Sequence, residues 1–229
     1  MVDPRYTRNI PSLSEEEWIQ ISQKRVCVIG CGGLGGNIIE HLARIGVGAV
    51  TVVDGDTFDT SNLNRQLLSN PSNLGQSKAV CAAERIRLIN PDVKVQVVEA
   101  FLDEDNASSI LAGHDVVIDA LDSPDARRIL AKACAGLDLT MIHGAISGWC
   151  GQIAVLKPGS LLMDNLYGDR QSLSSAPSTL SFTPSVCASI EVSEAVKVMC
   201  GRETELYDHM LFFDLQNNSF HLFDVRGIS

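Results

Sequence analysis

The sequence predicts an α/β fold built on a doubly wound, Rossmann-like, mostly parallel sheet that C-terminal antiparallel strands extend. Short apolar runs alternate with helical segments over most of the chain, and a glycine-rich loop follows the first run directly. The chain has 229 residues, of which 45 % are hydrophobic and 20 % are charged. This composition allows a sizeable core and excludes wholesale disorder.

The first segments predict a helical arm and one βαβ unit. Residues 1–24 are polar, and Ser14 and Glu17 have the spacing of a capping box before a short helix. The run RVCVIG that starts at Arg25 is typical of a parallel strand buried on both faces. The next segments, NIIEHLARIG and AVTVVD, predict a helix and a second buried strand, joined by a right-handed crossover.

A polar stretch over residues 55–75 shows no periodicity, and a loop of this length inside a compact fold is usually functional. It precedes a helix, SKAVCAAERIRLIN, that Asn90 and Pro91 end. Further strands are predicted at KVQVVEA, HDVVIDAL and LTMIHGAI, with helices near 104–112 and 124–136.

The C-terminal part follows a different pattern. We expect a strand at GQIAVLKP, a Ser-rich mobile loop over residues 158–181, a helix at VCASIEVSEAVKVMCG and a final hairpin around Asn217 and Asn218. Residues 25–229 should form a single nucleotide-binding domain after the 1–24 arm. Its Rossmann-like part is 25–148, and 149–229 supplies the remaining strands, loop and helix.

Charge and cysteine content narrow the function classes. The net charge is −10, with 18 basic and 28 acidic side chains, which argues against binding to nucleic acid. The seven cysteines form an odd set, and the N-terminus has no apolar signal core, so we expect no disulfide framework and a cytoplasmic location. No apolar run is long enough to span a membrane.

The glycine-rich loop carries the first functional signal. Gly30, Gly32 and Gly35 form G-x-G-x-x-G between a strand and a helix, where the backbone can approach a phosphate at the helix N-terminus. Asp54 ends the next strand, where a carboxylate can accept hydrogen bonds from a ribose. These features predict a nucleotide site and, taken alone, favour an NAD-dependent oxidoreductase.

Three further polar clusters favour ATP instead: SNLNRQ at 61–66, Lys78, and DALDS at 119–123. Arg65 and Lys78 would bring positive charge to a triphosphate, and Asp122 could hold Mg²⁺ just beyond the end of a strand. Each has an ordinary structural explanation when taken singly: an exposed loop arginine, a lysine in a first helical turn and a capping aspartate. Hydride transfer needs none of them.

Together and in this order, these motifs resemble the adenylating domain of the ThiF/MoeB/HesA family, which is related to ubiquitin-activating enzymes. The resemblance covers nearly the whole chain, from RYTRNI at 5–10 through GCGGLGGNIIEHLARIGVG, TVVDGDTFDTSNLNRQ and HGAISGWCGQ to FTPSVCASIEVSEAVKVMCG. It implies an ATP site made by Gly30, Gly32, Gly33, Gly35, Asp54, Ser61, Asn62, Asn64, Arg65, Lys78, Asp122 and Ser123. It also implies a homodimer in which Arg8 reaches the phosphates of the neighbouring subunit, with Arg8, Arg65, Lys78 and Asp122 as the catalytic set.

The reaction that the resemblance implies joins the C-terminal Gly-Gly carboxylate of a small ubiquitin-like sulfur carrier, ThiS- or MoaD-like, to the α-phosphate of ATP. The products are an acyl-adenylate and pyrophosphate, and Asp122 would position the Mg²⁺ ion. Relatives of this kind adenylate tRNA-linked carboxylates or peptides, which is one alternative. A family member that has lost its activity and an NAD-dependent oxidoreductase are others.

The sequence departs from the family pattern at its cysteines. Many members bind a structural zinc through two C-x-x-C pairs, but this chain has no such pair, so no zinc site is expected. Residues 159–181 hold no cysteine for a covalent intermediate, and Cys31, Cys150 and Cys187 are interpreted as structural. We therefore expect a variant that stops at the acyl-adenylate and leaves sulfur transfer to another protein.

Two histidines near the predicted site invite catalytic roles. His143 lies at a strand end and His114 precedes a strand. A hydrogen-bonded structural histidine explains both equally well, so neither belongs to the expected catalytic set.

Overall fold

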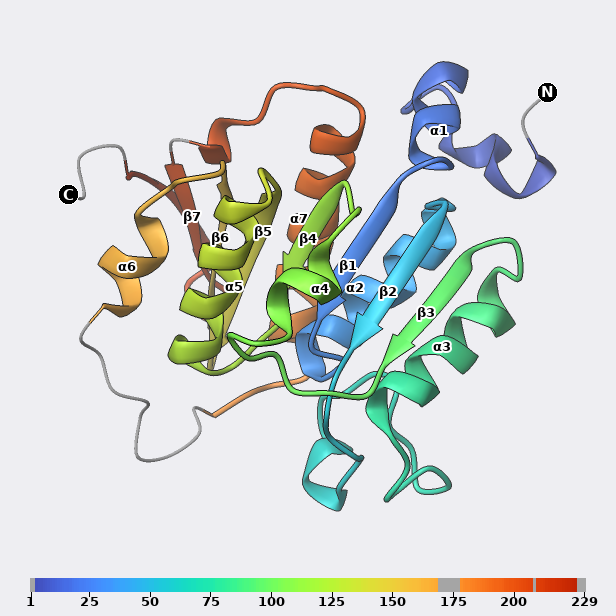
Figure 1. Ribbon diagram of the computed structural model, residues 1–229, viewed down its shortest axis with the longest axis horizontal. Coiled ribbons are helices and arrows are strands. Elements are labelled where there is room, and N and C mark those ends of the chain that lie inside the picture. The colour runs from blue at the N-terminus through green and yellow to red at the C-terminus, as the bar shows by residue number, and fades with distance from the viewer. Residues whose placement is uncertain (1–2, 169–177, 208, 226–229) are drawn as a thin grey trace.

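An eight-stranded sheet forms the centre of the computed structural model, and helices cover both of its faces (Figure 1). The structure describes residues 3–168, 178–207 and 209–225. The strand order is β3-β2-β1-β4-β5-β6-β7-β8, with β1 to β5 parallel and β6 to β8 antiparallel. The predicted fold class is therefore confirmed.

The strands are β1 (Arg25–Ile29), β2 (Ala49–Val53), β3 (Lys94–Val98), β4 (Val116–Asp119), β5 (Thr140–Ser147), β6 (Cys150–Leu156), β7 (His209–Asp214) and β8 (Ser219–Asp224). The α-helices are α1 (Glu15–Ile21), α2 (Gly33–Ile45), α3 (Lys78–Ile89), α4 (Ala107–Leu111), α5 (Pro124–Gly136), α6 (Leu162–Tyr167) and α7 (Phe182–Met199). Three short 3₁₀ helices, η1 (Pro4–Asn9), η2 (Thr60–Asn62) and η3 (Glu205–Tyr207), complete the described elements.

Each central strand contributes to two separate cores because successive side chains point to opposite faces of a sheet. In β1, Val26 and Val28 pack with the core that includes α2, α3 and α7, whereas Cys27 and Ile29 pack with the core that includes α4, α5 and α6. Burial on both faces explains why the parallel strands read as continuous apolar runs.

The N-terminal arm is attached at the end of the sheet where β1 begins (Figure 1). Ser14 and Glu17 form the predicted capping box, so the helix start is confirmed. Tyr6 is buried, and its hydroxyl accepts a hydrogen bond of 2.6 Å from Asn90 Nδ2. Glu17 also forms an ion pair with Arg202, which lies just beyond α7. These contacts hold the arm to the body of the protein.

Several element boundaries differ from the expectation. The α2 helix begins at Gly33, inside the glycine-rich loop, because glycine backbone can enter the helix where Leu34 and Ile38 are buried. The segment expected to be a loop contains α6, whose residues Leu162 and Met163 are buried. Residues 169–177 of that segment lie outside the described part of the chain. The α7 helix starts at Phe182, earlier than its apolar pattern indicates.

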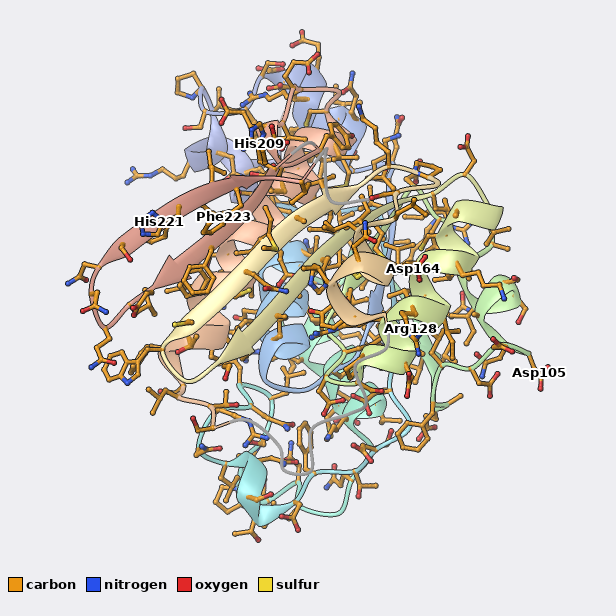
Figure 2. The ribbon with its side chains drawn as sticks, turned by 90° about the vertical axis from the view of Figure 1, so that its left-hand side faces the viewer. Asp105, Arg128, Asp164, His209, His221 and Phe223 are labelled. Carbon is orange, nitrogen blue, oxygen red and sulfur yellow. The ribbon has the colours of Figure 1, made fainter. Side chains whose placement is uncertain are left out.

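The predicted C-terminal hairpin is confirmed. Strands β7 and β8 pair in antiparallel register from His209 and Asp224 to Asp214 and Ser219, and Asn218 has a positive φ of 52°. Figure 2 shows His221 and Phe223 on this hairpin at the edge of the sheet. Among the described residues, no helix combines the length and the apolar character needed to cross a membrane.

We predict that Glu17→Gln weakens the protein at neutral pH more than at acid pH. The Arg202 guanidinium, which donates hydrogen bonds to Glu17, lowers the pKa of that carboxyl to about 2. The unfolded value is about 4.3, so the stabilising contribution is complete above that pH and disappears as the pH falls towards 2. Urea unfolding at pH 7 and pH 3 measures the effect. The exposed Glu104→Gln serves as control, and an equal loss at both pH values would contradict the prediction.

Candidate functional site

A cavity of about 720 Å³ opens where β1, β2 and β4 end. The chain turns from β1 towards β2 and β3 on one side, while β4 and β5 lie on the other, so this is the point where the strand order reverses. Open α/β sheets bind ligands at such a point, beyond the carboxyl ends of the strands. Eight of the predicted ATP-site residues line this cavity: Gly30, Gly32, Gly33, Asp54, Arg65, Lys78, Asp122 and Ser123.

The glycine loop forms the floor of the cavity through close backbone contacts. Gly30 has a φ of +101°, and a Cβ atom there would lie 2.7 Å from the Ala120 carbonyl oxygen. A Cβ atom on Gly35 would lie 1.8 Å from the Gly30 carbonyl oxygen. Gly35 therefore lies beneath the loop rather than in the cavity lining, and only glycine allows this tight entry into α2.

Asp54 fixes the loop to the end of β2. Its Oδ2 atom accepts a hydrogen bond of 2.7 Å from the Cys31 amide, and its Oδ1 atom accepts one of 2.8 Å from the Asp56 amide. Burial raises the pKa of Asp54, while these two hydrogen bonds oppose the rise. Each carboxylate oxygen retains a lone pair for a ligand hydroxyl at the cavity wall.

Two cationic side chains reach the cavity from separate segments. Lys78, at the start of α3, is buried, and its Nζ atom lies 3.1 Å from Asp56 Oδ2. The Arg65 side chain lies over Gly33, and its Nη1 atom donates to the Ser61 carbonyl at 2.9 Å and to Asn64 Oδ1 at 2.8 Å. The arrangement brings two positive charges to the glycine loop, as an anionic ligand requires.

Asp122 and Ser123 lie opposite these cations, between β4 and α5. Ser123 is the N-cap of α5, and its Oγ atom accepts a hydrogen bond from the Ala126 amide. Asp122 is exposed in the cavity wall, and no hydrogen bond or ion pair of its carboxylate is found in the part of the chain that the structure describes. A carboxylate in this position can coordinate a hard cation.

The cavity continues past the nucleotide-type residues along β5 and β6. Its further wall includes Ser147, Cys150, Gly151, Gln152, Tyr167, Thr179 and Phe212. Aromatic and uncharged polar side chains make this part less charged than the glycine-loop part.

Besides Gly35, three predicted residues lie outside the cavity lining and support it instead. Asn62 is buried and accepts a hydrogen bond from the Asp59 amide, which shapes η2. Ser61 and Asn64 accept hydrogen bonds from Arg65, and the Asn64 amide group donates to the Thr179 carbonyl at 3.3 Å. The Asn62 and Asn64 side chains and the Ser61 carbonyl thus orient the Arg65 segment.

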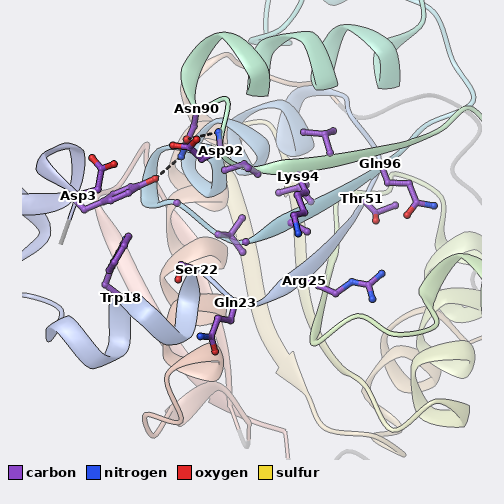
Figure 3. Close-up of a pocket in the computed structure, with 18 residues that line it drawn as sticks. Asp3, Trp18, Ser22, Gln23, Arg25, Thr51, Asn90, Asp92, Lys94 and Gln96 are labelled. Carbon is purple, nitrogen blue, oxygen red and sulfur yellow. Dashed lines mark hydrogen bonds between the residues drawn. The ribbon is translucent and has the colours of Figure 1, made fainter. Parts of the chain in front are cut away.

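Arg8 lies in η1, on the arm at the opposite end of the sheet (Figure 1). A second pocket of about 800 Å³ opens at this end, where β1, β2 and β3 begin, and is lined by Trp18, Arg25 and Lys94 among others (Figure 3). None of the predicted site residues lines this second pocket. Within one chain, Arg8 is therefore separated from the glycine-loop cavity by the length of the strands.

The thiols and histidines singled out in the sequence are mostly buried. Burial raises the pKa of Cys31 and of Cys187 well above the ordinary thiol value, so both are poor nucleophiles. Cys150 is half-buried at the cavity wall, and burial also raises its pKa. His114 is held by Thr51 Oγ1 and the Leu111 carbonyl, as a structural histidine is.

Sequence reasoning missed several residues of the cavity. Phe101 is exposed beside Gly55, Asp56 pairs with Lys78, and Arg127 and Tyr167 line the far wall. Asp56 lies two residues beyond Asp54, so the sequence did offer its acidic side chain as a candidate. The others carry no motif, because their positions depend on contacts between distant elements.

The fold and the cavity define an α/β protein of the nucleotide-binding class, with a glycine loop, two cationic side chains and the exposed Asp122 carboxylate in the cavity lining. The ThiF family model matches residues 6–227, and the chain belongs to the ThiF family. A SAMP-activating enzyme E1 of Haloferax volcanii is 34 % identical over 229 residues, which cover 97 % of this chain and 85 % of that protein. A sulfur carrier protein adenylyltransferase of Thermus thermophilus is 32 % identical over 235 residues, covering 97 % and 87 %.

A solved structure is similar as well. The E. coli tRNA N6-threonylcarbamoyladenosine dehydratase, in complex with ATP, superposes with a TM-score of 0.75 at 26 % identity, covering 86 % of this chain and 94 % of that one.

We predict that Gly35→Ala destabilises the protein and removes nucleotide binding. The added methyl group would overlap the Gly30 carbonyl, and overpacking of this kind costs about 1–3 kcal/mol or more. Thermal unfolding and binding of AMPCPP, a non-hydrolysable ATP analogue, measure the effect. Gly136→Ala in α5, where a Cβ atom meets nothing within 4 Å, is the matched control. Wild-type stability and binding in Gly35→Ala would rule out the close packing.

Proposed function

We propose that this protein is an ATP-dependent adenylyltransferase that activates the C-terminal Gly-Gly carboxylate of a small ubiquitin-like sulfur carrier. The observation that carries the proposal is the two-part cavity. One part is lined by a glycine loop, two cations and the exposed Asp122 carboxylate, and the other by residues of β5, β6 and α6 that we assign to the C-terminal chain of the carrier. The two named relatives, which act on SAMP and on a sulfur carrier protein, support the same assignment.

The proposed reaction is a displacement at phosphorus. A carboxylate oxygen of the carrier forms a bond to the α-phosphorus of ATP, and the bond from that phosphorus to the bridging oxygen of pyrophosphate breaks. The carboxylate is already ionised at neutral pH, so no general base is needed. The protein must align the two substrates and stabilise the negative charge, which is the role we assign to Arg65 and Lys78.

The residues present fit Mg²⁺ better than a protein-only metal cage. Among the described residues, no group of three or more His, Cys, Asp or Glu side chains could hold a metal ion. Asp122 supplies a single exposed carboxylate, and Mg²⁺ is commonly held by one or two carboxylates together with substrate phosphates and water. We assign Asp122 to Mg²⁺, which when bound would offset charge on the phosphates.

We further propose that the protein works without zinc and in the cytoplasm. Its seven cysteines are all free thiols, and none belongs to a C-x-x-C pair. Zinc analysis of the purified protein tests this assignment, with a near-stoichiometric content as the contrary result.

A homodimer is the assembly that we propose, with Arg8 acting in the site of the partner. The separation of Arg8 from the cavity of its own chain supports this arrangement (Figure 1). A guanidinium supplied by the second subunit would add a third positive charge at the phosphates.

A tRNA-linked carboxylate is the second candidate substrate. The solved dehydratase with its tRNA substrate class favours it, whereas the net charge of −10 weighs against it.

We predict that Asp122→Ala reduces ATP/pyrophosphate exchange by about 100-fold or more while leaving the fold intact, because the side chain is exposed and meets the metal rather than the core. Exchange is measured with small ubiquitin-like proteins ending in Gly-Gly, from the same genome. Versions ending in Gly-Gly-Ala and the exposed Asp105→Ala variant are the controls. A wild-type rate of pyrophosphate exchange in folded Asp122→Ala would contradict the role assigned to Asp122.

We predict that mixed dimers of Arg8→Ala and Asp122→Ala subunits recover about half of the wild-type exchange rate if Arg8 acts in trans. In such a dimer the site of the Arg8→Ala subunit keeps Asp122 and receives Arg8 from its partner, whereas each homodimer has two defective sites. Differently tagged subunits, co-purified and assayed beside both homodimers, measure this recovery. Activity no higher than that of the homodimers would contradict the action in trans.

A further inference from the structure

Four side chains, three of them buried and the fourth half-buried, form a ring in the wall of the cavity. Asp119 ends β4, His143 lies opposite it on β5, Arg127 comes from α5, and Tyr167 is the last residue of α6. Asp119 and His143 are completely buried, and Arg127 is 7 % exposed. None of the four belongs to the predicted ATP site, yet Arg127 and Tyr167 line the cavity.

The hydrogen bonds of the ring fit one protonation state. His143 Nδ1 lies 2.7 Å from Asp119 Oδ2, so the carboxylate accepts the Nδ1 proton. His143 Nε2 is then a lone pair, which faces the Tyr167 hydroxyl at 3.2 Å. Burial lowers the pKa of His143, which favours this neutral form. Tyr167 can therefore donate its own proton to His143 while its oxygen accepts from other groups.

Arg127 closes the ring. Its Nη1 atom donates to the Tyr167 hydroxyl at 2.8 Å, and its Nε atom lies 3.5 Å from Asp119 Oδ2. Gln152 also donates to the Tyr167 hydroxyl, at 3.0 Å. Arg127 Nε has no hydrogen-bond partner among the described residues, so its contact with Asp119 is an ion pair only. The hydrogen bonds hold the other members in place, because breaking one member of a buried network leaves a charge or dipole without compensation.

Two members of the ring also bind the backbone of Leu121, the residue before Asp122. Asp119 Oδ1 accepts a hydrogen bond of 2.9 Å from the Leu121 amide, and Arg127 Nη2 donates to the Leu121 carbonyl. Both polar groups of Leu121 are thus bound by members of the ring, and Asp122 is the next residue. These bonds fix the backbone from which the exposed Asp122 carboxylate extends.

We propose that the ring positions Asp122 for Mg²⁺. Tyr167 is the member that connects the backbone turn at Leu121 to α6. The proposal rests on the function proposed above and extends it to residues that hold the metal-binding carboxylate in place. Arg127 and Tyr167 act as positioning residues: they orient Asp122 and do not touch the metal. Groups that orient a metal ligand typically contribute about 10–100-fold in metal affinity or activity.

The test is Tyr167→Phe, which removes one hydroxyl and keeps the ring that packs against His143. We expect the Mg²⁺ concentration that half-saturates AMPCPP binding to rise by about 10-fold, measured by calorimetry without any carrier. The exchange rate should fall by a similar factor. Tyr207→Phe, whose ring contacts Lys157 outside the cavity, is the control and should match the wild type in both measurements.

A double variant separates positioning from a structural effect. If Tyr167 acts through Asp122, then Tyr167→Phe should add nothing to the Mg²⁺ dependence of AMPCPP binding in an Asp122→Ala background. An unchanged Mg²⁺ dependence in Tyr167→Phe, with or without a lower melting temperature, would overturn the proposal. So would an equal effect in both backgrounds. Failure of the proposed function would give a different result: the wild-type protein would not catalyse pyrophosphate exchange with any carrier that ends in Gly-Gly.

Discussion

The tight turn from β1 into α2 is the constraint on which the rest of the site depends. Gly30 passes so close to Ala120 at the end of β4, and Gly35 so close to Gly30, that neither position leaves room for a side chain. The ends of the paired strands β1 and β4 are thereby held together at one edge of the cavity. Asp54 then ties the loop to β2, so three strand ends share one rigid edge.

This rigid edge also explains how an acidic protein can bind a polyanion. The net charge of −10 is spread over the chain, whereas Arg65 and Lys78 converge on the glycine loop, where the N-terminus of α2 adds partial positive charge. Asp56 forms an ion pair with Lys78, so the lysine side chain is held in place without a ligand. The cations of the cavity are therefore gathered at the loop, although the protein as a whole is acidic.

The sequence predicted those features that short segments determine. Apolar runs, the capping box at Ser14 and the glycine loop each depend on residues a few positions apart, and all are confirmed. The predicted start of α7 was wrong and α6 was not predicted, because burial against other elements overrides the local pattern there. The ring of Asp119 and Tyr167 was beyond sequence reasoning, since it joins residues almost 50 positions apart that no spacing rule connects.

The chemistry of the thiols bears on where the reaction should end. A covalent transfer of the activated carboxylate would need a thiolate at the cavity, and Cys150 is the cysteine that lines it. Burial raises the pKa of Cys150, and nearby Asp214 adds to the rise, so little thiolate is present at neutral pH. Cys187 is less reactive still, because it is fully buried beside Glu191. In the reaction that we propose, a cavity lined by Arg65 and Lys78, with no activated thiol among the described residues, favours an acyl-adenylate that is passed to a sulfur donor on another protein.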